Sequence, residues 1–281
     1  FRHHSTVPTA WAQAGGNAQH TGQAPVVASG VRKVRWVATI GGHVGDPVVG
    51  ADGLLYVTTS DNKVFALETQ TGKVRWQKRN ADTLPVLFHA ISKPPHPRRG
   101  LPITYAQTHG KHGVVYCGGD GQHLYAYDAL TGQSRRTARP KSRWGGETQL
   151  PPVAAEDGML YTVSGGDLMA YDKNASQVRW IYSTAWKDAA GISHLVILND
   201  MPTIDPDHTV YLNATNYLVA LNAQTGTIRW KFTPPKGQGF GAPAPIIGAD
   251  GTVYLAGQND CLYAFDGKNG AVKWCRHFTN E

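Results

Sequence analysis

A six-residue sequence motif recurs along this chain and constrains its fold more than any other feature. T-G-K-V-R-W at residues 71–76 returns as T-G-T-I-R-W at 225–230 and, loosened, as N-G-A-V-K-W at 269–274. Each occurrence of the motif closes a longer pattern that runs from D-G-x-x-Y through a second apolar segment with a central Ala. Copies of this pattern occupy residues 51–76, 112–136, 156–180, 206–230 and 249–274. Recurrence at intervals of about 40 to 60 residues indicates a repeat architecture in which each unit packs on the next.

Each copy carries the signals of short β-strands joined by tight turns. Segments such as T-V-Y-L-A (252–256) and C-L-Y-A-F-D (261–266) are apolar runs bounded by Gly, Asn and Asp. Segments such as D-A-L-T-G (128–132) predict hairpin loops, in which Asp or Asn caps the turn and Gly takes a positive φ. A further strand is expected after a proline nine residues before the Tyr of four copies, at Pro47, Pro152, Pro202 and Pro245. Pro102 lies fourteen residues before Tyr116, which implies an insertion in that copy.

Four strands per unit, repeated around an axis, predict an all-β fold, a β-propeller of four-stranded antiparallel blades. The chain holds five full repeats plus an orphan N-terminal strand, V-R-K-V-R-W at 31–36. We therefore expect five to six blades, with a fragment of a larger propeller as the open alternative. Residues 1–10 are expected to form a tail and residues 11–281 a single β-propeller domain. The repeated aromatic rings are expected to fill the gaps between blades, and the tryptophan position falls at Trp36, Trp76, Arg136, Trp180, Trp230 and Trp274.

Composition agrees with this fold and excludes some classes of function. Gly (32) and Pro (17) are abundant among 281 residues and only 17% are charged, which is typical of a turn-rich ordered protein. The net charge of +7 is scattered, and its two dense runs, at 96–100 and 135–143, are interpreted as a solvated face. We therefore expect no nucleic-acid partner. No apolar stretch has the 18 residues or so that a membrane-spanning helix needs. The first residue is Phe1, which favours a processed or shortened precursor.

Three cysteines, Cys117, Cys261 and Cys275, form no C-x-x-C pair, so the spacing predicts neither a zinc knuckle nor a thioredoxin-like site. Cys261 and Cys275 flank one expected hairpin, and a disulfide between them is an open alternative.

The repeats resemble the pyrroloquinoline-quinone-type propeller repeats, a family that includes quinoprotein alcohol dehydrogenases and an outer-membrane assembly scaffold. The opening W-A-Q-A-G-G-N-A-Q-H-T-G (11–22) resembles the segment that begins the propeller in that family. The resemblance implies the fold, but enzymes, scaffolds and sensors share these repeats. It also implies that a quinone-dependent dehydrogenase would carry two adjacent cysteines and calcium beside a catalytic Asp. No two cysteines are adjacent here, so we expect neither pyrroloquinoline quinone nor calcium as a cofactor.

The loops that precede the innermost strands converge at one mouth of a propeller's channel, where a ligand pocket is expected. Glu147 and Asp200 are the candidate catalytic acid or base, with His43 or His194 as partner. Carboxylates with Asn199 also suit a hard cation, but no calcium-loop pattern is present and we expect no metal. The candidate ligand-binding residues are Asp46, Trp144, Gln149, Trp186, Asn199, Gln238 and Phe240, with Thr148 beside them.

These observations favour a noncatalytic propeller that serves as a ligand-sensing or protein-interaction scaffold module, extracytoplasmic and bacterial. Its expected partner is a small polar or aromatic ligand at the channel mouth or a protein on the rim. The alternative is an enzyme that uses the channel-mouth pocket for acid-base or cyclisation chemistry, as a lyase or isomerase does. A third reading is that a partner peptide adds as a strand to an exposed outer strand.

Overall fold

The computed structural model describes residues 33–79, 103–106, 113–117, 124–135, 152–155, 157–164, 166–187, 193–194, 198, 201–235, 238–241 and 243–278. Within them the fold is all-β, as the repeats predict, with five four-stranded antiparallel sheets and one two-stranded sheet. The described residues contain no helix that is long and apolar enough to cross a membrane.

Each four-stranded sheet takes its strands in sequence order, so it is a simple meander in which neighbours along the chain pair. The first sheet consists of β1 (Val48–Val49), β2 (Leu54–Thr59), β3 (Lys63–Glu68) and β4 (Val74–Arg79). The second consists of β5 (Ile103–Ala106), β6 (Val114–Cys117), β7 (Tyr125–Asp128) and β8 (Ser134–Arg135). The third consists of β9 (Val153–Ala154), β10 (Leu160–Ser164), β11 (Asp167–Tyr171) and β12 (Val178–Ser183).

The fourth sheet consists of β15 (Thr203–Ile204), β16 (Thr209–Asn213), β17 (Leu218–Asn222) and β18 (Ile228–Phe232). The fifth consists of β19 (Ile246–Ile247), β20 (Thr252–Ala256), β21 (Cys261–Asp266) and β22 (Val272–His277). The two-stranded sheet pairs β13 (Trp186–Lys187) with β14 (Ser193–His194). Every first strand begins directly after the proline that the sequence singles out, which confirms the predicted inner strand.

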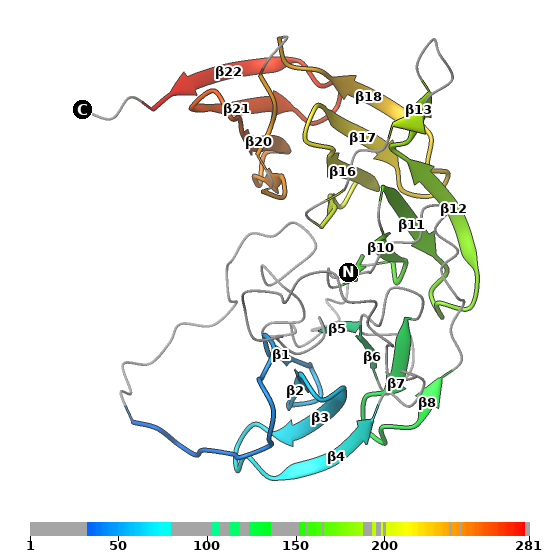
Figure 1. Cartoon of the computed structure of the whole chain (residues 1–281), viewed down its shortest axis with the longest axis vertical. Coiled ribbons are helices and arrows are strands. Elements are labelled where there is room, and N and C mark those ends of the chain that lie inside the picture. Colours follow the sequence, from blue (N-terminus) through cyan, green and yellow to red (C-terminus); the bar gives the residue numbers. More distant parts are fainter. Residues whose placement is uncertain are drawn as a thin grey trace, which may run out of the picture.

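The five sheets follow one another around an arc, with their fourth strands, β4, β8, β12, β18 and β22, at its periphery and the earlier strands of each sheet closer to its centre (Figure 1). The arc is open between the fifth sheet and the first, and no described sheet lies in that opening. The expected orphan strand at 31–36 differs from the structure, because the described part of this segment pairs with no described strand. It nevertheless places Trp36 against the first sheet, whose Thr69 carbonyl accepts a hydrogen bond from the Trp36 Nε1 at 2.9 Å.

The hairpin between the last two strands of a sheet has the predicted chemistry. In the second sheet the Asp128 carboxylate accepts hydrogen bonds from the Thr131 amide and hydroxyl, and Gly132 has φ +68°. This φ lies in the left-handed region that glycine adopts without steric cost. Four sheets also share one irregularity, a register shift just after the Ala that pairs with Trp, at Ala66, Ala170, Ala220 and Ala264.

The core consists of the interfaces between successive sheets. One cluster joins Val48, Tyr56 and Trp76 of the first sheet to Val115 and Tyr127 of the second. The corresponding cluster between the last two sheets contains Trp230, Phe240 and Phe265. Because a single sheet leaves both faces uncovered, each sheet depends on its neighbours for burial.

Candidate functional site

Two of the expected channel-mouth residues precede the first strand and are exposed. The backbone of His43 is held by the turn after β2, since its amide donates to the Ser60 hydroxyl at 2.9 Å and its carbonyl accepts from the Ser60 amide at 2.8 Å. Asp46 lies on the same connection and is also exposed. Both side chains therefore face solvent beside β1.

Two further candidates lie next to the fifth sheet, and they differ. Gln238 is exposed and its Oε1 accepts a hydrogen bond from the Asn259 Nδ2 at 3.0 Å. Phe240 is 0% exposed, and its ring packs edge-on against Tyr263 at a centroid distance of 5.6 Å. The structure thus places Phe240 in the core between the fourth and fifth sheets and not on the wall of a pocket. It does so because the face of the fifth sheet that turns toward the fourth is apolar and must be covered.

Trp186 and His194 are brought together, since they are directly paired residues of the β13–β14 ladder. In the view along the short axis, β13 lies at the periphery of the arc with β12 and β18 (Figure 1). That position differs from the channel mouth where the sequence predicts both residues. The remaining candidates lie outside the described residues and stay predictions: Trp144, Glu147, Thr148, Gln149, Asn199 and Asp200.

The described residues instead show a repeated contact between sheets, which we call the tryptophan clamp. In it the Trp Nε1 donates to a backbone carbonyl in the last hairpin of the next sheet. Trp76 binds the Ala129 carbonyl in this way, and Trp230 the Gly267 carbonyl, both at 2.8 Å. Trp180 and the Ala223 carbonyl give the same distance. In every case, Trp36 included, the acceptor lies three residues before the turn glycine.

A tyrosine of the same sheet completes the clamp. The Tyr211 hydroxyl lies within hydrogen-bond distance of the Gly267 carbonyl, at 3.1 Å, and of the Asp205 carboxylate, at 2.9 Å. The Gly267 carbonyl also accepts from Trp230, and the rings of Tyr211 and Trp230 lie 5.8 Å apart. The hydroxyl of Tyr161 likewise reaches the Ala223 carbonyl at 3.2 Å. Burial raises the pKa of Tyr161 and Tyr211 above the usual range, because the phenolate would lose its hydration. These hydroxyls are therefore hydrogen-bond donors of a packed interface.

The turn glycine is needed because the tryptophan ring lies against it. A Cβ on Gly270 would lie 2.5 Å from the Trp230 ring, and one on Gly132 would lie 2.7 Å from the Trp76 ring. The third sheet carries Ser176 at the corresponding position, and the preceding repeat carries Arg136 in place of Trp. The repeat that lacks the tryptophan is thus followed by the repeat that lacks the turn glycine. This coincidence is visible in the sequence and indicates that the two residues contact each other.

The fifth sheet carries the same tyrosine and tryptophan, and no further described sheet packs against them. Tyr254 and Trp274 lie 5.9 Å apart, at an interplanar angle of 49° that equals the angle of the clamped pair Tyr211 and Trp230. Trp274 is 43% exposed, whereas Trp230 is 8% exposed. No described residue accepts a hydrogen bond from the Trp274 Nε1 or the Tyr254 hydroxyl. We call this surface, with the half-exposed Val272 beside it, the open clamp.

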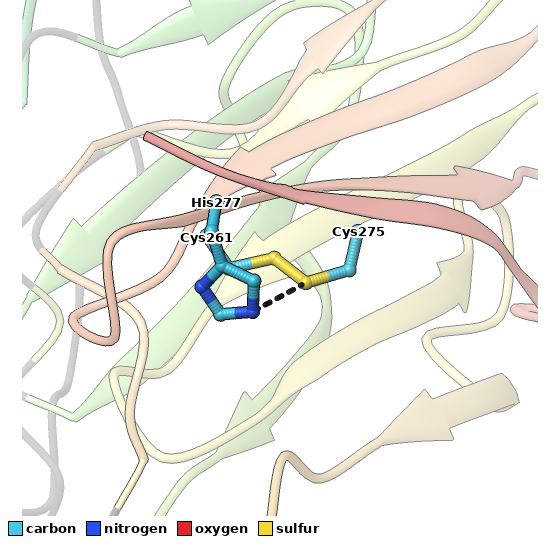
Figure 2. A group of neighbouring side chains, drawn as sticks. All are labelled: Cys261, Cys275 and His277. Carbon is cyan, nitrogen blue, oxygen red and sulfur yellow. Dashed lines mark hydrogen bonds between the residues drawn. A yellow bond between two sulfur atoms is a disulfide. The ribbon is translucent and has the colours of Figure 1, made fainter. Parts of the chain in front are cut away.

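The other face of β22 carries a cluster of three ligand-type side chains. Cys261 and Cys275 form a disulfide with a Cα–Cα distance of 5.9 Å. The sequence had left open whether these two cysteines are bonded. The two are diagonal neighbours and not opposite residues, because Cys261 pairs with His277 and Cys275 with Tyr263. The His277 Nε2 lies 3.8 Å from the Cys275 Sγ (Figure 2). Sequence spacing gave no reason to include His277, because its place depends on the strand register.

Two family models match the chain. The model described as "Glucose/ethanol/alcohol dehydrogenase, beta-propeller domain" matches residues 43–138. The model described as "Outer membrane protein assembly factor BamB" matches residues 184–280, which include the open clamp and the disulfide.

Curated relatives and solved structures agree with these models. The outer membrane protein assembly factor BamB of Moranella endobia is 23% identical over 81% of this chain and 52% of its own length. The serine/threonine-protein kinase AfsK of Streptomyces griseus is 30% identical over 46% of this chain and 16% of its own. The quinohemoprotein alcohol dehydrogenase ADHIIG of Pseudomonas putida HK5 has a TM-score of 0.73 at 17% identity, over 97% of this chain and 48% of its own. The chain spans about half the length of the BamB relative, and the structural likeness concerns the fold alone.

Proposed function

Since this chain belongs to the pyrroloquinoline-quinone-like β-propeller repeat family, we propose that it acts as a noncatalytic scaffold that binds a protein partner outside the cytoplasm. The similarity to proteins named outer membrane assembly factors supports a role in protein interaction. The disulfide between Cys261 and Cys275 supports an oxidising compartment, because such bonds persist mainly outside the cytoplasm.

The open clamp is the observation that carries this proposal. Its aromatic pair has the geometry of the clamped pairs, so the surface is preorganised and little side-chain entropy is lost on binding. Trp and Tyr are the side chains most enriched among residues that dominate binding energy at interfaces. Each also offers a polar donor, the Trp274 Nε1 and the Tyr254 hydroxyl.

The clamps within the chain specify what the partner presents. The complementary group is a tight β-hairpin with a carbonyl acceptor three residues before a glycine of positive φ. A side chain at that glycine would collide with the indole ring, as the contact at Gly270 demonstrates. We therefore propose a protein partner that docks such a hairpin on the open clamp. The proposal assigns the chain no quinone and no calcium.

A photo-reactive residue at position 274 tests the proposal, with position 181 as the matched control. Ile181 also lies on a fourth strand and is 44% exposed, close to the 43% of Trp274. We expect position 274 alone to cross-link to a second protein. That protein, once purified, is expected to bind the Trp274→Ala variant more weakly by about 2 kcal/mol, or about thirtyfold, and the Ile181→Ala variant with unchanged affinity.

Two results would contradict the scaffold proposal. Cross-links confined to the same polypeptide would mean that the open clamp is filled internally. Equal yields from positions 274 and 181 would mean that the aromatic pair confers no selectivity.

A further inference from the structure

We propose that Cys261, Cys275 and His277 form a redox-controlled binding site for a thiophilic divalent cation of the zinc class. In the oxidised protein the two sulfurs are joined and no thiolate is available. When the bond is reduced, two thiolates and one imidazole become free to coordinate the same ion. The site is independent of the scaffold role, since its side chains lie on the face of β22 opposite Trp274.

The strand pairing brings the three ligands to one face. Cys261 and His277 are directly paired residues of β21 and β22, and Cys275 lies two residues before His277 on the same strand. Because side chains alternate between faces along a strand, all three point to the same side, and the intervening Arg276 points to the other. The ligand atoms all lie within 4.8 Å of one another (Figure 2).

The distances suit a tetrahedral ion after a small change in the cysteine side chains. Zinc lies about 2.3 Å from sulfur and about 2.0 Å from imidazole nitrogen, which sets its ligands about 3.5 to 3.8 Å apart. The Cys275 Sγ and His277 Nε2 are already 3.8 Å apart. The two sulfurs must separate to a similar distance, and a Cα–Cα distance of 5.9 Å allows this by side-chain rotation alone.

Burial divides the three ligands in a way that suits an accessible ion. Cys261 is buried against the core between the last two sheets, while Cys275 and His277 are exposed. The ion therefore enters from solvent at the end of β22, and its fourth position is open to water or an external ligand. Paired strands hold the ligand backbones in place, so the site is largely formed before the ion binds.

The redox step balances with a dithiol as reductant. A dithiol transfers two electrons and two protons to the Cys261–Cys275 bond, which yields two thiols and converts the dithiol to its own disulfide. The divalent cation then displaces the two thiol protons and binds the thiolates, with neutral His277 as the third ligand. The reverse exchange with a disulfide oxidises the two thiolates to the Cys261–Cys275 bond and reduces that disulfide to a dithiol, which removes both sulfur ligands and releases the ion.

Cobalt(II) titration of the full chain, reduced with a phosphine and kept anaerobic, tests this site. We expect one equivalent to produce a thiolate-to-cobalt charge-transfer band with the visible absorption of a tetrahedral ion, and zinc to abolish both. Cys261→Ser and Cys275→Ser are expected to lose the charge-transfer band, and His277→Ala to bind cobalt at least about tenfold more weakly. Cys117→Ala is the control, because Cys117 is buried in β6 and burial raises the pKa of its thiol, which keeps it protonated.

Thermal unfolding provides a second readout that does not depend on colour. Zinc is expected to raise the unfolding temperature of the reduced protein, since it binds the folded state, and to leave the oxidised protein unchanged. The proposal is overturned if the reduced protein shows no charge-transfer band, if oxidised protein binds cobalt equally well, or if His277→Ala retains full affinity.

Discussion

Replacement of Gly270 by Ala tests whether the tryptophan clamp requires glycine for space or only for backbone conformation. Gly251 of the same sheet provides the control, because its φ of +77° matches the +74° of Gly270. A Cβ at Gly251 would meet nothing within 4 Å, whereas one at Gly270 would lie 2.5 Å from the Trp230 ring. The two variants therefore share the backbone strain and differ in the collision.

The expected magnitudes follow from these contacts. An alanine held in the left-handed backbone conformation lowers stability by about 1–2 kcal/mol, and the lower entropy of the unfolded chain with alanine offsets about 0.4–1 kcal/mol of that loss. Gly251→Ala should therefore lower the free energy of unfolding by about 1 kcal/mol. Gly270→Ala adds overpacking of about 1–3 kcal/mol and weakens the bond from the Trp230 Nε1 to the Gly267 carbonyl, so we expect a loss of about 2–4 kcal/mol.

Urea unfolding followed by both circular dichroism and tryptophan fluorescence measures this difference. Coincident transitions in the two signals are needed before the free energies are compared. Equal losses in Gly251→Ala and Gly270→Ala would refute the reasoning, because the glycine would then serve conformation alone. A larger loss in Gly251→Ala would refute it as well.

Two further predictions concern the clamp and its hairpin turns. Trp230→Leu should lower the free energy of unfolding by about 3 kcal/mol, while Trp274→Leu should change it by less than about 1 kcal/mol. The reason is that, of these two tryptophans, only Trp230 is covered by a following sheet, so equal effects in urea unfolding would contradict an open clamp. Burial alone would raise the pKa of Asp128, but hydrogen bonds from Arg135 and Thr131 outweigh it and hold that pKa below the ordinary 3.8. The Asp128 carboxylate therefore stabilises the fold above pH 3.8, and this contribution is lost as the pH falls through the lower folded pKa. Asp128→Asn should have a free energy of unfolding lower by about 0.5–1 kcal/mol at neutral pH, and that free energy should fall less steeply in acid than in the parent protein. Identical profiles of stability against pH for variant and parent would disprove this.

Local patterns predicted the elements of the fold well. The prolines before the inner strands, the glycines of the hairpins and the paired apolar runs all describe contacts between residues close in sequence, which depend on turn chemistry and alternation. The same patterns were less informative about the candidate site. Phe240 lies in a glycine-rich segment, yet it is a core residue, because the rings of Tyr263 and Phe265 of the fifth sheet pack against it.

His277 gave no sequence signal either. Its place beside the Cys275 sulfur follows from the pairing of Cys261 with His277, and that pairing is set after a register shift at Ala264. A slip of one residue would send the side chain to the opposite face, so no count of residues along the chain alone predicts the cluster.

The sequence by itself determined that this chain repeats a four-stranded unit, where the first strand of each unit begins, and which residues close the hairpins. It did so because strand alternation and turn conformation are local properties of a few neighbouring residues. Only the tertiary structure decided that, of the two described tryptophans Trp230 and Trp274, the first is covered and the second is left exposed. Trp230 and Trp274 occupy the same position in their repeats. They differ in exposure because the fourth sheet, which carries Trp230, is followed in space by the fifth, whereas the described arc ends at the fifth sheet, which carries Trp274.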